Sequence, residues 1–212
     1  MTERHAAFLR AINVGGNNML PMKDLKAAFE RAGATNVVTY IQSGNVAFDA
    51  PAARAEKIAA AVVKAIVASH GVHSPIAVRS HADLARVAAS NPFLAEKSPP
   101  ETTSLYVAFL TTTPTAERVA ALDPNRSPPD RFVVRERDIY LAYVKGAAKT
   151  KITNTWFDRQ LDTVSTVRNW RTLLTMVELT RTSDAKAARK APRSRETSSK
   201  SRPRAASKAR AR

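Results

Sequence analysis

The chain has 212 residues, of which 44% are hydrophobic and 25% charged, a composition that is ordinary for a globular protein of one large or two small domains. It has no cysteine, which excludes disulfide scaffolds, zinc ribbons, iron–sulfur centres and thiol nucleophiles. The net charge is +16, and the segment from Arg181 onward, with twelve basic and two acidic residues, carries +10 of it. Most of the basicity therefore belongs to one segment.

The N-terminus runs into a strand pattern without a separate apolar signal region. The longest apolar stretch, residues 58–68, is interrupted by Lys64 and is too short to span a bilayer. We therefore expect a soluble cytoplasmic protein with no membrane partner.

Strand and helix signals alternate in the first part of the chain. Apolar residues recur at helical spacing after Pro21, which suits the start of a helix. The expected elements are a strand over 5–12, a helix from 21 to 33, strands over 36–41 and 46–49, a helix over 52–70 and a strand over 76–79. This β-α-β-β-α-β order is that of a ferredoxin-like unit.

After a short helix over residues 82–90 the pattern starts again. The expected elements are a strand over 103–110, a helix over 114–122, a hairpin of 132–135 and 138–144, and helices over 153–161 and 170–179. Residues 163–167 are only a weak candidate for the closing strand. We predict an α+β fold of two ferredoxin-like halves, 1–90 and 103–180, joined by a linker at 91–102. The second half is expected to be incomplete, with extra C-terminal helices.

The basic segment 181–212 is predicted to be a disordered tail. Residues 182–212 contain no aromatic and no large aliphatic side chain, so they cannot bury enough apolar surface to offset the entropy of ordering. Their cations would bind nucleic-acid phosphates without sequence preference. These cations are Lys186, Arg189, Lys190, Arg193, Arg195, Lys200, Arg202, Arg204, Lys208, Arg210 and Arg212.

The first candidate site is the turn Gln42-Ser43-Gly44-Asn45 between two expected strands. If Ser43 and Gly44 form a two-residue loop, Gln42 and Asn45 face each other on one side of the sheet. Ile41 would then lie on the opposite, core side. The alternative is plain turn chemistry, since Ser, Gly and Asn are common turn residues.

The second candidate is the loop that begins at Asn13, with Arg10 before it and Lys23 after it. Its paired Gly15 and Gly16 allow close approach of a ligand to the backbone, and the helix that follows favours anions at its N-terminus. The spacing fits neither the Walker pattern nor the dinucleotide fingerprint. The alternative is a simple connection between a strand and a helix.

Two further candidates lie in the second half. Lys149 and Lys151 follow a glycine and would hold an anionic group as point charges, or they belong to a solvated loop. Arg168, Asn169 and Trp170 would bind a planar ligand by stacking. Alternatively, Trp170 is a core anchor and Arg168 caps a helix end.

The sequence predicts no metal site and no cofactor. His70 and His73 straddle Gly71, so they do not share a regular helix face. No Ser-His-Asp order and no pair of acids indicates an active site of a known type. The catalytic residues of any reaction are therefore unknown at this point.

Several motifs together resemble the bacterial family catalogued as domain of unknown function 1697. They are Phe8-Leu9-Arg10-Ala11-Ile12-Asn13-Val14-Gly15-Gly16-Asn17-Asn18, Pro21-Met22, Tyr40-Ile41-Gln42-Ser43-Gly44-Asn45-Val46, Lys149-Thr150-Lys151, Asn154, Phe157, Leu161 and Arg168-Asn169-Trp170. The resemblance implies an α+β fold with ferredoxin-like halves and assigns no activity or site residue. Ala11 replaces a frequent glycine, and Asp158 and Asp162 stand where Glu and Gly are expected.

These observations favour a binding module for a small anionic or planar ligand, held by loops at strand ends. One alternative is nucleic-acid association through the tail. Another is an undescribed transfer enzyme that uses the Ser43 or Thr150 hydroxyl beside Lys151. Convergence of Arg10, Asn45, Lys151 and Arg168 on one cleft would favour binding or catalysis, and the sequence leaves the oligomeric state open.

Overall fold

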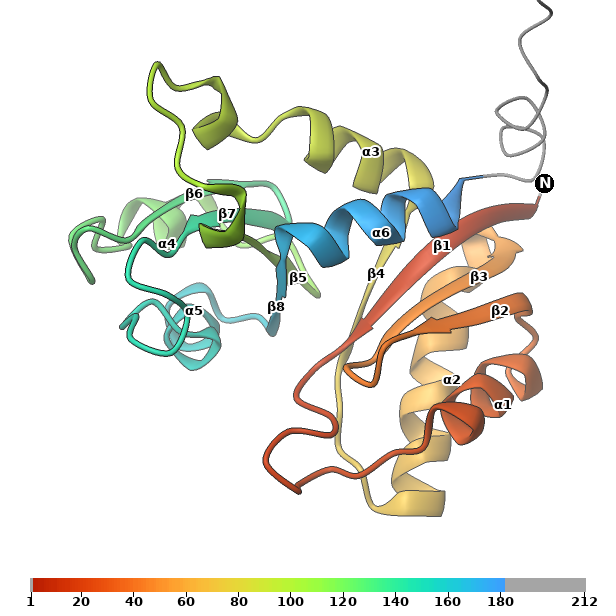
Figure 1. Cartoon of the computed structure of the whole chain (residues 1–212). Helices are drawn as coiled ribbons and strands as arrows, with labels where there is room; N and C mark the ends of the chain where they lie inside the picture. The colour runs from red at the N-terminus through yellow and green to blue at the C-terminus, as the bar shows by residue number, and fades with distance from the viewer. Residues whose placement is uncertain (1, 182–212) are drawn as a thin grey trace, which may run out of the picture. The chain divides into compact units, whose positions relative to one another are not determined.

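A computed structural model describes residues 2–181 of the chain. Within them, the first half forms one antiparallel sheet with the strand order β2-β3-β1-β4 (Figure 1). Its elements are β1 (Thr2–Leu9), α1 (Met22–Arg31), β2 (Thr35–Tyr40), β3 (Asn45–Pro51), α2 (Ala52–His70) and β4 (Ile76–Ser80). This is the predicted β-α-β-β-α-β order.

Local sequence explains the ends of the two helices in this half. Pro21 stands at the N-cap of α1 with φ of −60°, and its ring cannot continue a strand ladder. The buried face of α1 is Leu25, Ala28 and Phe29, three positions at helical spacing. Helix α2 ends at Gly71, whose left-handed φ of +64° is the usual stop for a helix.

The second half forms a sheet with the order β6-β7-β5-β8. Its elements are β5 (Leu105–Leu110), α4 (Ala116–Ala120), β6 (Arg131–Arg135), β7 (Asp138–Ala142), α5 (Asn154–Leu161) and β8 (Ser165–Asn169). The segment that looked only like a weak strand candidate is β8, which pairs with β5 along its length. It completes the second half, which the apolar pattern had left incomplete, and the α+β fold is confirmed.

Each sheet is followed by a helix that starts directly from its last strand. Helix α3 (His81–Ala89) begins with a capping box between Ser80 and Asp83, and α6 (Trp170–Thr180) is capped by Asn169. The expected linker contains the short 3₁₀ turns η1 (Pro92–Ala95) and η2 (Thr102–Ser104). Phe93 in η1 is buried, so this connection contributes to the core.

Both faces of the first sheet are covered. Successive strand residues point to opposite sides, and each side packs into a different hydrophobic cluster. Leu9 and Phe48 pack with α1 and α2 on one face. Phe8 and Ala47 belong to a second cluster that includes Phe109 of β5, with residues of α3 and α6. Helices α3 and α6 contact each other beside this cluster (Figure 1). The sheet face that carries Asn45 is therefore not an open surface.

The β2–β3 turn is longer than the sequence suggested. Tyr40 pairs with Asn45, so Gln42 does not lie opposite Asn45 as predicted. Ile41 adopts φ of +46° and is 52% exposed rather than part of the core. Gly44 has φ of +73°, and a Cβ at this position would lie 2.6 Å from a β1 side chain. Only glycine fits here, because both the backbone and the available space exclude a side chain.

The predictions for residues 182–212, including disorder and the basic nucleic-acid contacts, lie outside the described residues. Among residues 2–181, no helix combines the length and the apolar character needed to cross a membrane. The cytoplasmic location and the boundaries of the two halves as separate domains stay predictions.

Candidate functional site

The two halves meet at equivalent positions of their sheets. Strands β1 and β5 share the sequence Ala-Phe-Leu, as Ala7-Phe8-Leu9 and Ala108-Phe109-Leu110. The rings of Phe8 and Phe109 stack with their centroids 4.3 Å apart and their planes 9° from parallel. Each half therefore presents the same strand to the other, and the contact between them is reciprocal.

Arg168, near the end of β8, extends from the second half into the first. Its Nε donates to Asn45 Oδ1 at 2.6 Å, and its Nη2 donates to the backbone oxygens of Leu9 at 2.5 Å and Ser43 at 3.0 Å. Its Nη1 donates to Thr166 Oγ1 and to the backbone oxygen of the preceding valine. The guanidinium also lies 5.6 Å from the centre of the Phe8 ring.

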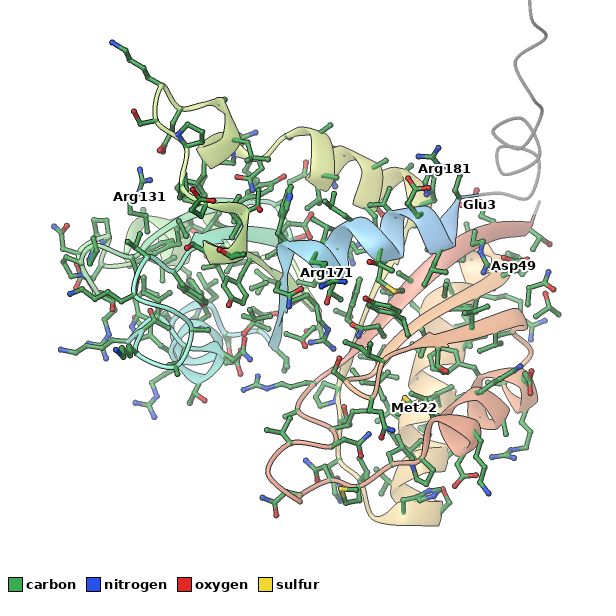
Figure 2. The ribbon with its side chains drawn as sticks, viewed as in Figure 1. Glu3, Met22, Asp49, Arg131, Arg171 and Arg181 are labelled. Carbon is green, nitrogen blue, oxygen red and sulfur yellow. The ribbon has the colours of Figure 1, made fainter. Side chains whose placement is uncertain are left out.

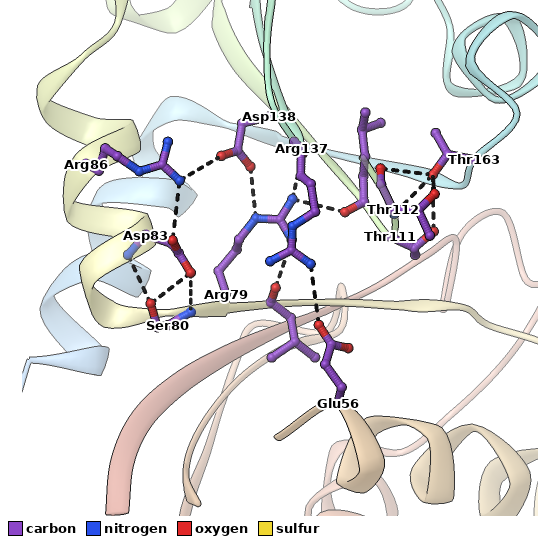
Figure 3. Close-up of polar contacts among 12 residues, drawn as sticks. Glu56, Arg79, Ser80, Asp83, Arg86, Thr111, Thr112, Arg137, Asp138 and Thr163 are labelled. Atoms are coloured by element: carbon purple, nitrogen blue, oxygen red, sulfur yellow. Dashed lines mark hydrogen bonds and ion pairs between the residues drawn. The ribbon is translucent and has the colours of Figure 1, made fainter. Parts of the chain in front are cut away.

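Arg79, near the end of β4, makes the mirror set of contacts from the first half into the second. Its Nε donates to Asp138 Oδ1 at 2.9 Å, and its Nη2 donates to the backbone oxygens of Leu110 at 3.0 Å and Arg137 at 2.6 Å. It lies 5.4 Å from the centre of the Phe109 ring. Figure 3 shows Arg79 between Asp138 and Arg137.

The two arginine sites differ in the charge of their partner. Asp138 is a carboxylate at the first position of β7, and Arg86 approaches its second oxygen at 3.7 Å. The residue at the first position of β3 is the neutral Asn45. Within residues 2–181, no carboxylate forms an ion pair with Arg168. Arg168 is therefore a partly buried cation whose charge is not neutralised by the chain around it.

Burial affects the pKa values at both sites. Desolvation lowers the pKa of Arg79, and Asp138 opposes this effect. Burial raises the pKa of Asp138, and Arg79 opposes that shift in turn. For Arg168, burial alone lowers the pKa to about 10, because an ionised guanidinium loses hydration and gains no opposite charge. Arg168 is still protonated at neutral pH.

Arg10, a predicted ligand contact, is neutralised by the other half of the chain. Its Nη1 donates to Asp158 Oδ2 on α5. Asp158 Oδ1 accepts from the backbone N–H of Ser165 at 2.8 Å and from its hydroxyl at 2.7 Å. Arg10 therefore ties β1 to α5 and does not supply a free charge. Asp158 carried no sequence signal beyond its departure from the family pattern.

A cleft of about 450 Å³ opens beside Arg168, within the range of small-molecule sites. It lies between the loop after β1, the β2–β3 turn and the end of β8, and the described residues that line it include no Asp or Glu. Its polar lining is Ser43, Tyr106, Asn154, Thr166, Arg168, Asn169 and Thr172, and its apolar lining includes Ile12, Val14 and Ile41.

One amide of this lining has a fixed orientation. The Asn169 side-chain oxygen accepts from the Thr172 backbone N–H at 2.8 Å, so its NH₂ group points elsewhere. Asn154 Oδ1 lies 3.2 Å from the Ser165 hydroxyl, whose single proton is donated to Asp158 Oδ1 at 2.7 Å. In the described part of the chain neither the Asn154 nor the Asn169 NH₂ group has an acceptor.

Two hydroxyls add to this set of donors. Ser43 Oγ accepts from Asn45 Nδ2 at 2.9 Å, so its own proton is available. The Tyr106 hydroxyl has no hydrogen-bond partner among residues 2–181. The cleft thus combines one partly buried positive charge with hydrogen-bond donors that lack acceptors, which is the chemistry of an oxyanion receptor.

The structure brings only some of the predicted residues to the cleft. Ser43, Arg168 and Asn169 line it, and Asn45 holds Arg168 from behind. Asn13 instead fixes its own loop. Its Nδ2 donates to the backbone oxygens of Leu20 and Gln42, and its Oδ1 accepts from the Leu20 N–H. The predicted ligand residues that do not line the cleft are Arg10, Asn13, Gly15, Gly16, Lys23, Gln42, Lys149, Lys151 and Trp170.

For Trp170 and the lysine loop the structure favours the alternatives to ligand binding, a core residue and a solvated loop. Trp170 is 4% exposed and belongs to the cluster between the two halves. Lys149 and Lys151 are exposed. Thr150 Oγ1 accepts from the backbone of Ile152, and in the described residues neither this hydroxyl nor that of Ser43 bonds a histidine or carboxylate that would act as a base. Residues 2–181 also contain no group of three or more His, Asp or Glu suited to a metal ion.

The fold and the cleft define a class of α+β protein in which two equivalent sheets meet at a stacked phenylalanine pair and a cationic cleft lies between the two halves. The model of the protein of unknown function family DUF1697 matches residues 1–140. The chain belongs to this family, as its motifs indicated. No curated protein matches the sequence.

A solved structure shares the fold. The chain is similar to the conserved bacterial protein SP0830 from Streptococcus pneumoniae, with a TM-score of 0.64 and 21% sequence identity over 85% of this chain and 100% of that one. At this identity the similarity concerns the fold alone.

Proposed function

We propose that the cleft beside Arg168 binds a small ligand that carries an oxyanion, a carboxylate or a phosphate. The observation that carries the proposal is the contrast between the two arginines. Arg79 is buried with a carboxylate partner, whereas Arg168 is partly buried and its partner is an amide. A buried charge is costly unless it is compensated. A bound anion would supply the compensation that Asp138 supplies at the equivalent position.

The ligand would contact the donors of the cleft rather than Arg168 itself. All five N–H groups of the Arg168 guanidinium already donate to oxygens of the chain. The direct hydrogen bonds would come from the Ser43 and Tyr106 hydroxyls and from the Asn154 and Asn169 amides. Arg168 would then act through its charge, which is screened less than that of an exposed side chain because the group is partly buried.

The test is the substitution Asn45→Asp, which places a carboxylate against Arg168 in the arrangement that Asp138 has with Arg79. The fold already accommodates such a pair at the equivalent site. At an effective dielectric constant near 20, a unit charge several ångströms away changes the binding free energy by about 1–4 kcal/mol. We therefore expect sulfate or inorganic phosphate, titrated calorimetrically, to bind the variant at least roughly tenfold more weakly than the wild type.

The matched control is Asn125→Asp, which makes the same change of net charge at an exposed turn that does not line the cleft. It should bind the anions like the wild type. Thermal unfolding of both variants should stay cooperative. Unchanged affinity in Asn45→Asp, or no anion binding by the wild type, would contradict the proposal.

We also propose that residues 182–212 associate with nucleic acid. The support is their charge, since they and Arg181 hold +10 of the +16. Binding of this kind should lose about 10³–10⁵ in affinity between low and moderate salt if roughly 6–10 phosphates are contacted. Gel shifts of the full chain and of a chain ending at Arg181 test it, and retained affinity in the shorter chain would remove the assignment to this segment.

A further inference from the structure

A second hollow adjoins the anion cleft. It has a volume of about 510 Å³ and lies between η2 and the first turns of α6. Tyr106 and Asn169 line both hollows, so the two adjoin at these residues. Asn169 is also one of the donors without an acceptor, so a ligand that it binds lies next to the second hollow. We call the second hollow the α6 groove.

The α6 groove is predominantly apolar, and more so than the cleft beside Arg168. Leu174 of α6 lines it and is 44% exposed, one of the exposed large hydrophobic residues of the described surface. The edge of Trp170 and the ring of Tyr106 complete the apolar wall. Tyr106 is held from behind by Tyr143, with ring centres 5.0 Å apart. The groove therefore offers rigid apolar surface to a ligand.

A free cation stands at the same groove. Arg171 lines it and is exposed on the first turn of α6 (Figure 2). Among residues 2–181, the Arg171 side chain has neither an ion pair nor a hydrogen bond. A planar guanidinium beside apolar surface is suited to stacking on the face of an aromatic ring.

We infer that the ligand is an aromatic oxyanion, with its anionic group in the cleft beside Arg168 and its ring in the α6 groove. This inference rests on the proposed anion binding and adds the chemical class of the rest of the ligand. Leu174 and Tyr106 pack against the ring, and Arg171 covers its face. The anionic group is either a phosphate or a carboxylate, since the same donors suit both.

The experiment compares each simple anion with its aromatic counterpart. The probes are inorganic phosphate and phenyl phosphate, then acetate and benzoate, titrated into the full chain. Burial of a phenyl ring in the groove should make the aromatic member of the preferred pair about tenfold tighter or more. The preferred pair identifies the oxyanion.

Leu174→Asn removes the apolar wall at a half-exposed position and should cancel most of this aromatic gain while leaving the simple anion unaffected. Leu94→Asn is the matched control, because Leu94 is similarly exposed, at 41%, and does not line the groove. Arg171→Gln should reduce the gain in part.

The outcomes separate the two proposals. If the wild type binds none of the probes, the proposed anion binding fails and the inference fails with it. If inorganic phosphate or acetate binds and the aromatic counterpart binds no tighter, the inference alone is overturned. An aromatic gain that survives Leu174→Asn, or that Leu94→Asn reduces equally, also overturns it.

Discussion

The Arg79 and Arg168 sites occupy equivalent positions in the two halves and differ in one decisive partner. Both arginines end a strand, cross to the other sheet, bond the backbone oxygen of its central strand and lie near a stacked phenylalanine. The first meets Asp138 and the second meets Asn45. Shared geometry explains why both hold the halves together. It does not explain why only one is neutralised.

The difference teaches how a docking contact becomes a binding site. The Arg79 side chain and its carboxylate are each 1% exposed, and none of the described clefts reaches them. At the other end an amide replaces the carboxylate, a cleft opens beside it and donors without acceptors line that cleft. The Arg79 contact is thus buried and purely structural, whereas the equivalent Arg168 contact borders a cleft.

The largest effect is expected for Asp138→Ala. It leaves the Arg79 guanidinium buried without its counter-ion, which should lower the free energy of unfolding by about 3–5 kcal/mol. Urea denaturation measures this loss. Glu30→Ala is the control, because the Lys26–Glu30 pair is on the surface of helix α1 and its removal should change stability by less than about 1 kcal/mol. Equal effects of the two substitutions would show that the buried pair is not what joins the halves.

A smaller effect concerns pH and belongs to the Arg168 site alone. Its pKa of about 10 lies below the ordinary value of 12.5, so Arg168 loses its charge at a lower pH than an ordinary arginine. Sulfate keeps its charge over this range. We therefore expect sulfate affinity to be constant from about pH 7 to 9 and to fall by roughly tenfold as the pH passes 10.

The matched measurement is the Asn125→Asp variant, which should follow the same pH profile as the wild type. The Asn45→Asp variant should show weak binding throughout, because its cation is neutralised at every pH of the range. Wild-type sulfate affinity that stays constant to pH 11 would mean that Arg168 does not provide the attraction.

Much of the fold could be predicted because apolar periodicity marks most elements. The exceptions have local causes. Strand β8 is short and carries Ser165, Thr166 and Asn169, so its apolar signal is weak, although pairing with β5 makes it regular. The sequence predicts a two-residue β2–β3 turn because isoleucine is typical of strands. The prediction is wrong, because Ile41 has a positive φ and lies in the loop.

The site could be predicted only in part. Arg168, Asn45 and Ser43 were identified individually from turn and motif chemistry. The contact between Arg168 and Asn45 could not be predicted, because the two residues are 123 positions apart and the contact depends on how the halves dock. The same reason hides the Arg79–Asp138 pair, 59 positions apart, and Asp158, which neutralises Arg10. One sequence signal was available for both arginines. The pairs Val78-Arg79 and Val167-Arg168 occupy equivalent positions in the last strand of each half.

The smallest effect is expected for Lys149 and Lys151, the two lysines that the sequence predicted as anion ligands. Lys149 and Lys151 are exposed, line neither the cleft nor the α6 groove and are not in any ion pair among residues 2–181. Replacing both by alanine should change the free energy of unfolding by less than about 0.5 kcal/mol. Their charge is screened by solvent, so at 0.15 M salt the sulfate affinity should change less than about twofold. Calorimetric titration of the double variant beside Asn45→Asp measures the contrast directly. If the lysine variant loses as much affinity as Asn45→Asp, the anion is attracted by surface charge, and Arg168 is not the source of the attraction.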